Sequence, residues 1–130
     1  MTPLPYDATD EELIGYVDQW AALLEIENYQ LAAQFTDHVP EMKWTSELIQ
    51  EIIKNCGECR PDQKVTVAGK PTDITQRKEV DRWERNDLDE IGEVWYDLNI
   101  DGLASDLTAT FRIQDAGNGL ILRLNDIHVM

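Results

Sequence analysis

Two residues near the end of the chain have the types and the spacing of an acid–base pair. Asp126 and His128 stand two positions apart, so both side chains point to one face if this segment is a β-strand. A histidine beside a carboxylate can exchange protons near neutral pH, and Asp97 offers a further carboxylate. Asp97, Asp126 and His128 are therefore the catalytic candidates. We favour the alternative that Asp126 accepts backbone hydrogen bonds and His128 is a surface residue, because such pairs are common in structural networks.

Carboxylates also gather around one predicted hairpin, at Asp97, Asp101 and Asp106. The segment resembles the start of a calcium-binding loop, but Thr108 stands at the twelfth position, where such a loop needs a glutamate. Asp101 followed by glycine is a strong turn signal instead. We therefore expect a turn here, no metal site and no cofactor.

The two cysteines, Cys56 and Cys59, form a single C-x-x-C pair. A zinc site would need two further ligands, and the only histidines, His38 and His128, have no partner at ligand spacing. The pair follows a predicted helix, where the helix dipole does not lower a thiol pKa. We expect a structural or incidental role.

The charge of the chain narrows the classes of partner. It carries 26 acidic residues against 11 lysines and arginines, a formal net charge of -15. Residues 1–42 contain no lysine or arginine at all. Such a surface repels nucleic-acid phosphates and anionic membranes, and attracts a basic protein. The first residues lack a signal peptide, and no apolar run is long enough to span a membrane, so we expect a cytoplasmic location.

Two amphipathic helices are predicted in the first half. Thr9 and Glu12 form a capping box, and apolar residues then recur every three or four positions for about seven turns, with a possible kink near Glu27. This helix ends near Asp37, before Pro40. A second helix begins at residue 45 or 46 and stops near residue 57.

The second half predicts strands. A short edge strand is expected at residues 64–67, and residues 73–86 favour an edge strand over a helix because their apolar residues form no helical stripe. After a turn at residues 84–92, three segments of alternating apolar residues predict a β-meander that runs to the last residue. The alternation shifts by one position near Asn125, which predicts a bulge there.

The meander also predicts two different faces. Val94, Tyr96 and Leu98 belong to the buried set, while Trp95 points to the other face with Thr108, Thr110 and Arg112 beside it in register. A large aromatic residue on a polar face suggests a covered interface, which we assign to Trp95, Thr108, Thr110 and Arg112. The alternative is an exposed tryptophan packed on Arg112.

Helices followed by an antiparallel sheet imply one α+β domain over residues 1–130, with the helices on one face of a curved sheet. The pattern of Trp20, Leu23, Tyr29 and Ala32 resembles the opening helix of the cystatin-like, nuclear-transport-factor-2-like cone-fold superfamily. The segments GEVWYDLNIDGLASDLTATF and LNDIHVM resemble a group of small uncharacterised bacterial proteins. This resemblance implies a cone with an open mouth, and a homodimer through the outer sheet face.

Charge and resemblance together favour a non-enzymatic interaction domain. Some small acidic cone-fold proteins bind and neutralise toxins, so an immunity-type protein that binds a basic toxin is our first hypothesis. The alternative hypothesis is a small-ligand binder or isomerase-like enzyme. It would use the cone interior, with Asp97, Asp126 and His128 as its acid–base groups.

Overall fold

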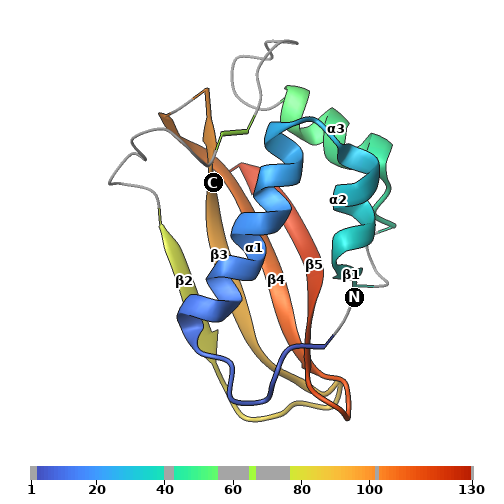
Figure 1. Cartoon of the computed structure of the whole chain (residues 1–130), viewed down its shortest axis with the longest axis vertical. Helices are drawn as coiled ribbons and strands as arrows, with labels where there is room; N and C mark the ends of the chain where they lie inside the picture. Colours follow the sequence, from blue (N-terminus) through green and yellow to red (C-terminus); the bar gives the residue numbers. More distant parts are fainter. Residues whose placement is uncertain (1–2, 40–42, 56–64, 67–76, 102, 130) are drawn as a thin grey trace.

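The computed structural model describes residues 3–39, 43–55, 65–66, 77–101 and 103–129 (Figure 1). Helices α1 (Asp10–Glu25), α2 (Tyr29–Phe35) and α3 (Ser46–Asn55) come first, broken by the two-residue strand β1 (Asp37–His38). Strands β2 (Lys78–Arg82), β3 (Glu90–Ile100), β4 (Leu103–Asp115) and β5 (Leu120–Val129) follow. The coarse expectation of a single α+β chain with helices before a meander is confirmed.

The predicted first helix is two helices. The capping box is present, since the Glu12 backbone N–H donates to Thr9 Oγ1 at 3.1 Å. The prediction of one continuous helix with a kink is wrong, because Glu27 adopts a left-handed conformation with φ 60 that ends the helical path. Asn28 then caps α2 by accepting a hydrogen bond from the Leu31 backbone N–H at 3.2 Å.

The sheet is mixed, with strand order β1-β5-β4-β3-β2. Three pairings are antiparallel, but β1 lies parallel to β5, which corrects the expectation of a purely antiparallel sheet. The predicted edge strand within residues 73–86 is confirmed by β2; residues 73–76 lie outside the described residues. At the other predicted edge strand, Val65 forms an isolated bridge with Ile100.

The meander begins earlier than predicted and carries the predicted bulge. Strand β3 starts at Glu90, inside the segment expected to be a turn, and Asp89 with φ 60 ends that turn instead. Thr110 lies opposite Asp126, whereas Phe111 lies opposite Leu124, so Asn125 is the extra residue in β5. Beyond the bulge the apolar alternation returns to the same face.

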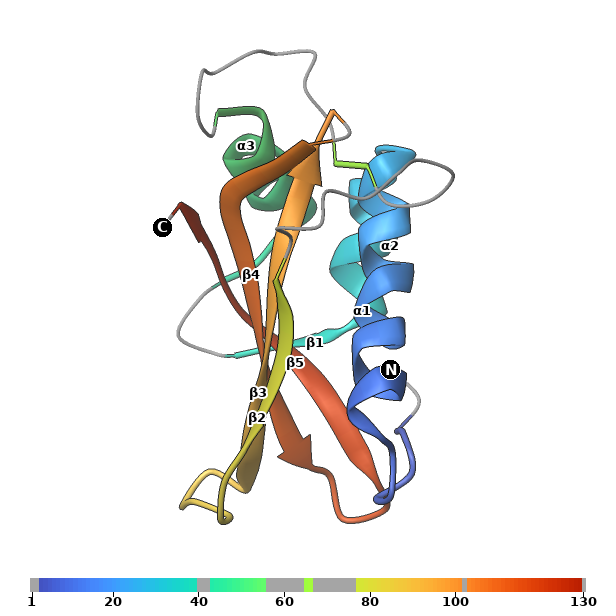
Figure 2. The same cartoon turned by 90° about the vertical axis from the view of Figure 1, so that its left-hand side faces the viewer.

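Helices α1 and α2 lie on one side of the twisted sheet (Figure 2). The core between helices and sheet is packed with fully buried side chains, among them Trp20 of α1, whose ring meets Phe111 of β4 edge-on at 5.0 Å between centroids. The buried set includes Leu13, Val17, Trp20, Leu24, Ile49, Ile53, Val94, Tyr96, Leu98, Phe111, Ile113, Leu122 and Leu124. None of the helices in the described ranges is long and apolar enough to cross a membrane.

Candidate functional site

The outer sheet face is the face turned away from α1, and it holds the residues that the sequence singled out. In the register of the sheet, Trp95 lies between Glu79 of β2 and Thr110 of β4, and Asp97 lies beside Thr108. Thr108 and Thr110 are buried between their neighbours, while Trp95 is half-buried. The predicted grouping of Trp95, Thr108, Thr110 and Arg112 on one face is confirmed.

Three groups fix the position of the Trp95 ring. Its Nε1 donates to Asp97 Oδ1 at 2.9 Å, the Arg77 guanidinium lies 4.3 Å from its centroid, and His128 meets it edge-on at 6.0 Å. The packing of Trp95 on Arg112 that the sequence suggested is wrong. Arg112 lies over Trp83 instead, with its guanidinium carbon 5.7 Å from the centroid of that ring.

The Asp97 carboxylate binds three neighbouring groups on the outer sheet face. It accepts hydrogen bonds from Trp95, from Thr108 Oγ1 at 3.0 Å and from the Arg77 backbone N–H at 3.2 Å. Three donors around one carboxylate hold it in place and use its acceptor sites. Asp97 therefore positions the aromatic ring and the start of β2.

Asp126 and His128 come together as expected, but on the outer sheet face. His128 Nδ1 lies 3.1 Å from Asp126 Oδ2, and the two residues lie opposite Thr108 and Thr110 of β4. With Asp97 beside Thr108, all three catalytic candidates share one face. The alternative hypothesis needs them on the helical side of the sheet, where the structure has packed apolar side chains instead.

Glu93 also lies on this face, as the alternation of the strand predicts, but it was not among the candidate residues. Burial raises its pKa, and neighbouring Asp81 and Glu90 raise it further, while Arg112, with Nε 3.6 Å from Glu93 Oε2, opposes the shift. Only the alternation along the strand indicates the position of this side chain, since Glu93 is two residues before Trp95 and so faces the same way.

A second polar cluster, which the sequence did not predict, lies between α1 and the sheet. The Tyr96 hydroxyl donates to Asp18 Oδ1 at 2.5 Å, and Lys78 Nζ lies 2.9 Å from the same oxygen. Burial, with Asp18 as a hydrogen-bond acceptor and a nearby negative charge, raises the pKa of Tyr96 above its usual range. Tyr96 is fully buried and its hydroxyl is satisfied, so this cluster fastens α1 to β2 and β3.

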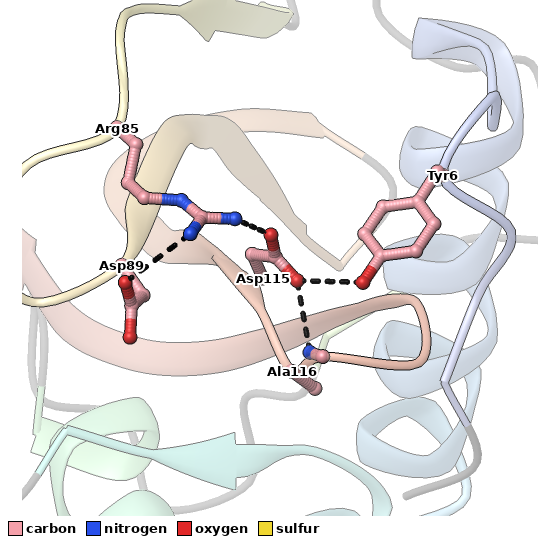
Figure 3. A pocket seen from close by; sticks show the side chains of 6 residues that line it. Tyr6, Arg85, Asp89, Asp115 and Ala116 are labelled. Carbon is pink, nitrogen blue, oxygen red and sulfur yellow. Dashed lines mark hydrogen bonds and ion pairs between the residues drawn. The ribbon is translucent and has the colours of Figure 1, made fainter.

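A surface pocket of about 420 Å³ opens at the other end of the sheet, lined by Tyr6, Arg85, Asp89, Asp115, Ala116 and Gly117 (Figure 3). Arg85 forms an ion pair with Asp115 and lies 3.7 Å from Asp89. Asp115 Oδ1 accepts hydrogen bonds from the Tyr6 hydroxyl and from the backbone N–H of Gly117, both at 2.8 Å. These contacts join the N-terminal residues, the β2–β3 turn and the β4–β5 turn. None of the candidate residues from the sequence lines this pocket.

The remaining candidates for chemistry do not assemble. Asp101 lies exposed at the turn between β3 and β4, and Cys56 and Cys59 lie outside the described residues. Among the residues that the structure describes, no three His, Cys, Asp or Glu side chains are placed to hold a metal ion. The outer sheet face is thus the place where the candidates converge.

Comparison with known proteins gives one match. The model of a family described as a domain of unknown function, DUF7668, matches residues 21–130. No curated protein and no solved structure matches the chain.

Proposed function

The chain belongs to the DUF7668 family, and we propose that it is a non-enzymatic protein-interaction domain whose outer sheet face receives a basic partner protein. The observation that carries this proposal is the fixed tryptophan on the sheet face turned away from α1 and α2 (Figure 2). Tryptophan and arginine dominate the binding energy of protein interfaces, and both are held in place here before any partner binds.

Charge favours a basic partner on this face. Carboxylates outnumber guanidinium groups across it: Glu79, Asp81, Glu93, Asp97 and Asp126 stand against Arg77, Arg112 and Arg123. The whole chain carries a net charge of -15, which speeds its encounter with a positively charged surface. An immunity-type role, in which the domain neutralises a basic toxin in the cytoplasm, fits this chemistry.

The cystatin-like cone and the homodimer belong to the same proposal. The twisted sheet with α1 and α2 on one side supports the cone (Figure 2). The isomerase-like alternative finds less support, because Asp97, Asp126 and His128 lie on the open face and make hydrogen bonds, ion pairs or ring contacts there. An interaction surface needs no rearrangement of these three side chains.

The test is a titration with a purified basic nuclease, followed by nuclear magnetic resonance. We expect the largest shifts at the Trp95 indole N–H and at Thr108 and Thr110. Trp95→Ala should weaken binding by about tenfold or more, as for a central interface aromatic.

Leu31→Ala is the matched control, because Leu31 is an exposed apolar side chain of α2 on the helical side. It should bind as the unsubstituted chain does. Shifts confined to α1 and α2, with Trp95→Ala binding normally, would reject the outer sheet face as the binding surface.

A further inference from the structure

The pocket of about 420 Å³ lies where the β2–β3 turn meets the end of β4. A volume of this size falls within the range of small-molecule sites, about 300–1,000 Å³. Three separate parts of the chain supply its walls, namely the N-terminal residues, the β2–β3 turn, and the end of β4 with the turn after it. Their lining residues are Tyr6, Arg85, Asp89, Asp115, Ala116 and Gly117.

Backbone and side-chain hydrogen bonds hold the Asp89 wall of this pocket in place. Asp89 has φ 60, a left-handed conformation that few non-glycine residues adopt. Its N–H donates to the Asn86 carbonyl at 3.1 Å, and its carbonyl accepts from the Asp115 N–H at 2.9 Å. The Asn86 side chain fixes the same turn, since its Oδ1 accepts from the N–H of Leu88 and of Glu90. A preformed wall of this kind loses little free energy to ordering when a ligand enters.

Two side chains of the pocket keep unused hydrogen-bonding capacity. The Asp89 carboxylate lies 3.7 Å from Arg85 Nη1, beyond hydrogen-bond distance, and accepts no hydrogen bond from the residues that the structure describes. The Arg85 guanidinium carries five N–H donors, and its ion pairs with Asp89 and Asp115 involve only its two terminal nitrogens. Both Arg85 and Asp89 are exposed, so a ligand can reach them from solvent.

Asp115, in contrast, forms the closed floor of the pocket. Its side chain is 12% exposed, its Oδ1 accepts from the Tyr6 hydroxyl and the Gly117 N–H, and its Oδ2 pairs with Arg85. The bond to Asp115 fixes the Tyr6 ring, which lies across Asp115 from Arg85 (Figure 3). An aromatic ring held in this way offers a flat apolar surface to the C–H groups of a ligand.

The charges of the pocket favour a neutral ligand. An anion would meet the carboxylates of Asp89 and Asp115, and a cation would meet the guanidinium of Arg85 that already pairs with both. A neutral molecule with several hydroxyl groups meets neither repulsion. Each hydroxyl can donate to a carboxylate oxygen and accept from an N–H, which are the two functions that Asp89 and Arg85 provide.

We propose that this pocket binds a neutral polyhydroxyl molecule of the size of a monosaccharide. Asp89 and Arg85 bond neighbouring hydroxyl groups of the ligand, and the Tyr6 ring lies against its C–H groups. A ligand with so few atoms should bind with a dissociation constant in the low millimolar range. The site is separate from the outer sheet face and does not depend on the basic partner proposed there.

The test is a titration of the full chain with D-glucose, D-galactose, D-mannose and D-ribose, followed by nuclear magnetic resonance. At least one of these sugars should shift the N–H signals of Asp89 and Gly117 and the ring signals of Tyr6, with saturation below about 50 mM. The Trp95 indole N–H should stay unchanged. Inorganic phosphate and putrescine, an anion and a cation, should leave the pocket signals unchanged at matched ionic strength.

Substitutions in the β2–β3 turn locate the ligand. Asp89→Gly removes the carboxylate and tolerates positive φ, so sugar binding should weaken about tenfold. Asp89→Asn keeps an acceptor and also tolerates this backbone, and should weaken binding about threefold. Asp87→Gly and Asp87→Asn are the matched controls, because Asp87 is an exposed acid of the same turn that does not line the pocket. Both controls should bind sugar as the unsubstituted chain does.

Three outcomes would overturn the proposal. The absence of shifts at Tyr6, Asp89 and Gly117 with all four sugars would mean that the pocket binds no polyhydroxyl ligand. Shifts caused by phosphate or putrescine in place of the sugars would give the pocket a charged ligand. Equal binding by the Asp89 and Asp87 variants, once thermal unfolding shows them folded, would place the sugar elsewhere. None of these results would change the binding of a basic protein to the outer sheet face.

Discussion

The two edges of the sheet differ in the symmetry of their charges. Strand β2 reads Lys-Glu-Val-Asp-Arg, a pattern of signs that is the same in both directions about Val80. An antiparallel copy of β2 centred there would place Glu79 opposite Asp81 and Lys78 opposite Arg82, which repels. Strand β5 reads Asp-Ile-His about its own centre, and reversal places unlike groups together.

Tertiary contacts reinforce the difference. The cations of β2 are taken by α1, since Lys78 pairs with Asp18 and Arg82 donates to Asp10 and to the Ala8 carbonyl. On the β5 side, the described residues that pair with the edge are Asp37 and His38 of β1 and, near the start of β5, Leu4. The two edge strands therefore differ in the order of their charges and in the segments that hold them, and the order of charges decides whether like or unlike groups would meet across an antiparallel copy.

The attachment of β2 to the sheet depends on Gly92, which lies opposite Arg82. A Cβ at this position would lie 2.4 Å from the Asp81 carbonyl oxygen and 3.0 Å from Ile113 Cδ1. Because backbone has to move, Gly92→Ala should lower the free energy of unfolding by about 3 kcal/mol in urea denaturation. Gly15→Ala is the control: a Cβ there meets nothing within 4 Å on α1, and should stabilise by about 1 kcal/mol. Equal stability of the two variants would contradict this account of β2.

Tyr96 connects β3 to α1 beneath the β2 edge. Tyr96→Phe should cost about 1–2 kcal/mol at neutral pH, because Asp18 loses a charge-assisted hydrogen bond. The fold raises the pKa of Tyr96 above the ordinary tyrosine value of 10.0, so above that pH the unfolded chain loses a proton that the native chain keeps. Stability should therefore fall by about 1.4 kcal/mol per pH unit from this group alone. Urea denaturation from pH 7 to 11 should show a smaller slope for Tyr96→Phe, and an unchanged slope would exclude this assignment.

Arg82 secures the far end of β2. Its Nε and Nη2 both reach Asp10 Oδ1, at 2.9 and 2.8 Å, but the two side chains are 40% and 56% exposed. Solvent screening limits the energy of this ion pair, so Arg82→Met should lower the free energy of unfolding by about 0.5–1 kcal/mol. Hydrogen exchange should speed up at β2 amides and stay constant in β5. Faster exchange in both strands would mean that the two edges are coupled.

Glu79→Lys reverses one charge on the β2 edge and should leave the stability of the monomer almost unchanged. Glu79 is exposed, so stability should change by less than about 0.5 kcal/mol. The new sign pattern places unlike charges at residues 79 and 81 of two antiparallel copies, so β2 should now accept its own copy. The variant should therefore self-associate more strongly than the unsubstituted chain in light scattering. Equal association of the two chains would show that the order of charges does not govern the β2 edge.

The sequence predicted the meander with its register because alternation is a local property with a period of two. The bulge at Asn125 followed from a single shift in that alternation, and the grouping of Trp95 with Thr108 and Thr110 followed from the hairpin turn. The break in the first helix was harder to predict. A kinked helix and two separate helices have the same apolar spacing here, and only the left-handed backbone of Glu27 shows that the first helix ends.

The sequence predicted which residues make up the candidate site, but it did not predict which side chains they contact. Arg77 was not among the partners expected for Trp95, and Asp18 meets Tyr96 across 78 positions of sequence. Strand β1 has two residues and no period to detect. Such contacts depend on how the elements pack, and no pattern along the chain reports them.

The amino-acid sequence by itself determined the acidity of the chain, the α+β order of elements and the two faces of the meander. Each of these depends on residue type and local spacing. Only the tertiary structure decided that Asp97, Asp126 and His128 lie on the outer sheet face, that α1 fastens β2, and that β1 pairs in parallel with β5. These are relations between segments far apart in the chain, and packing of the helices on the sheet sets them.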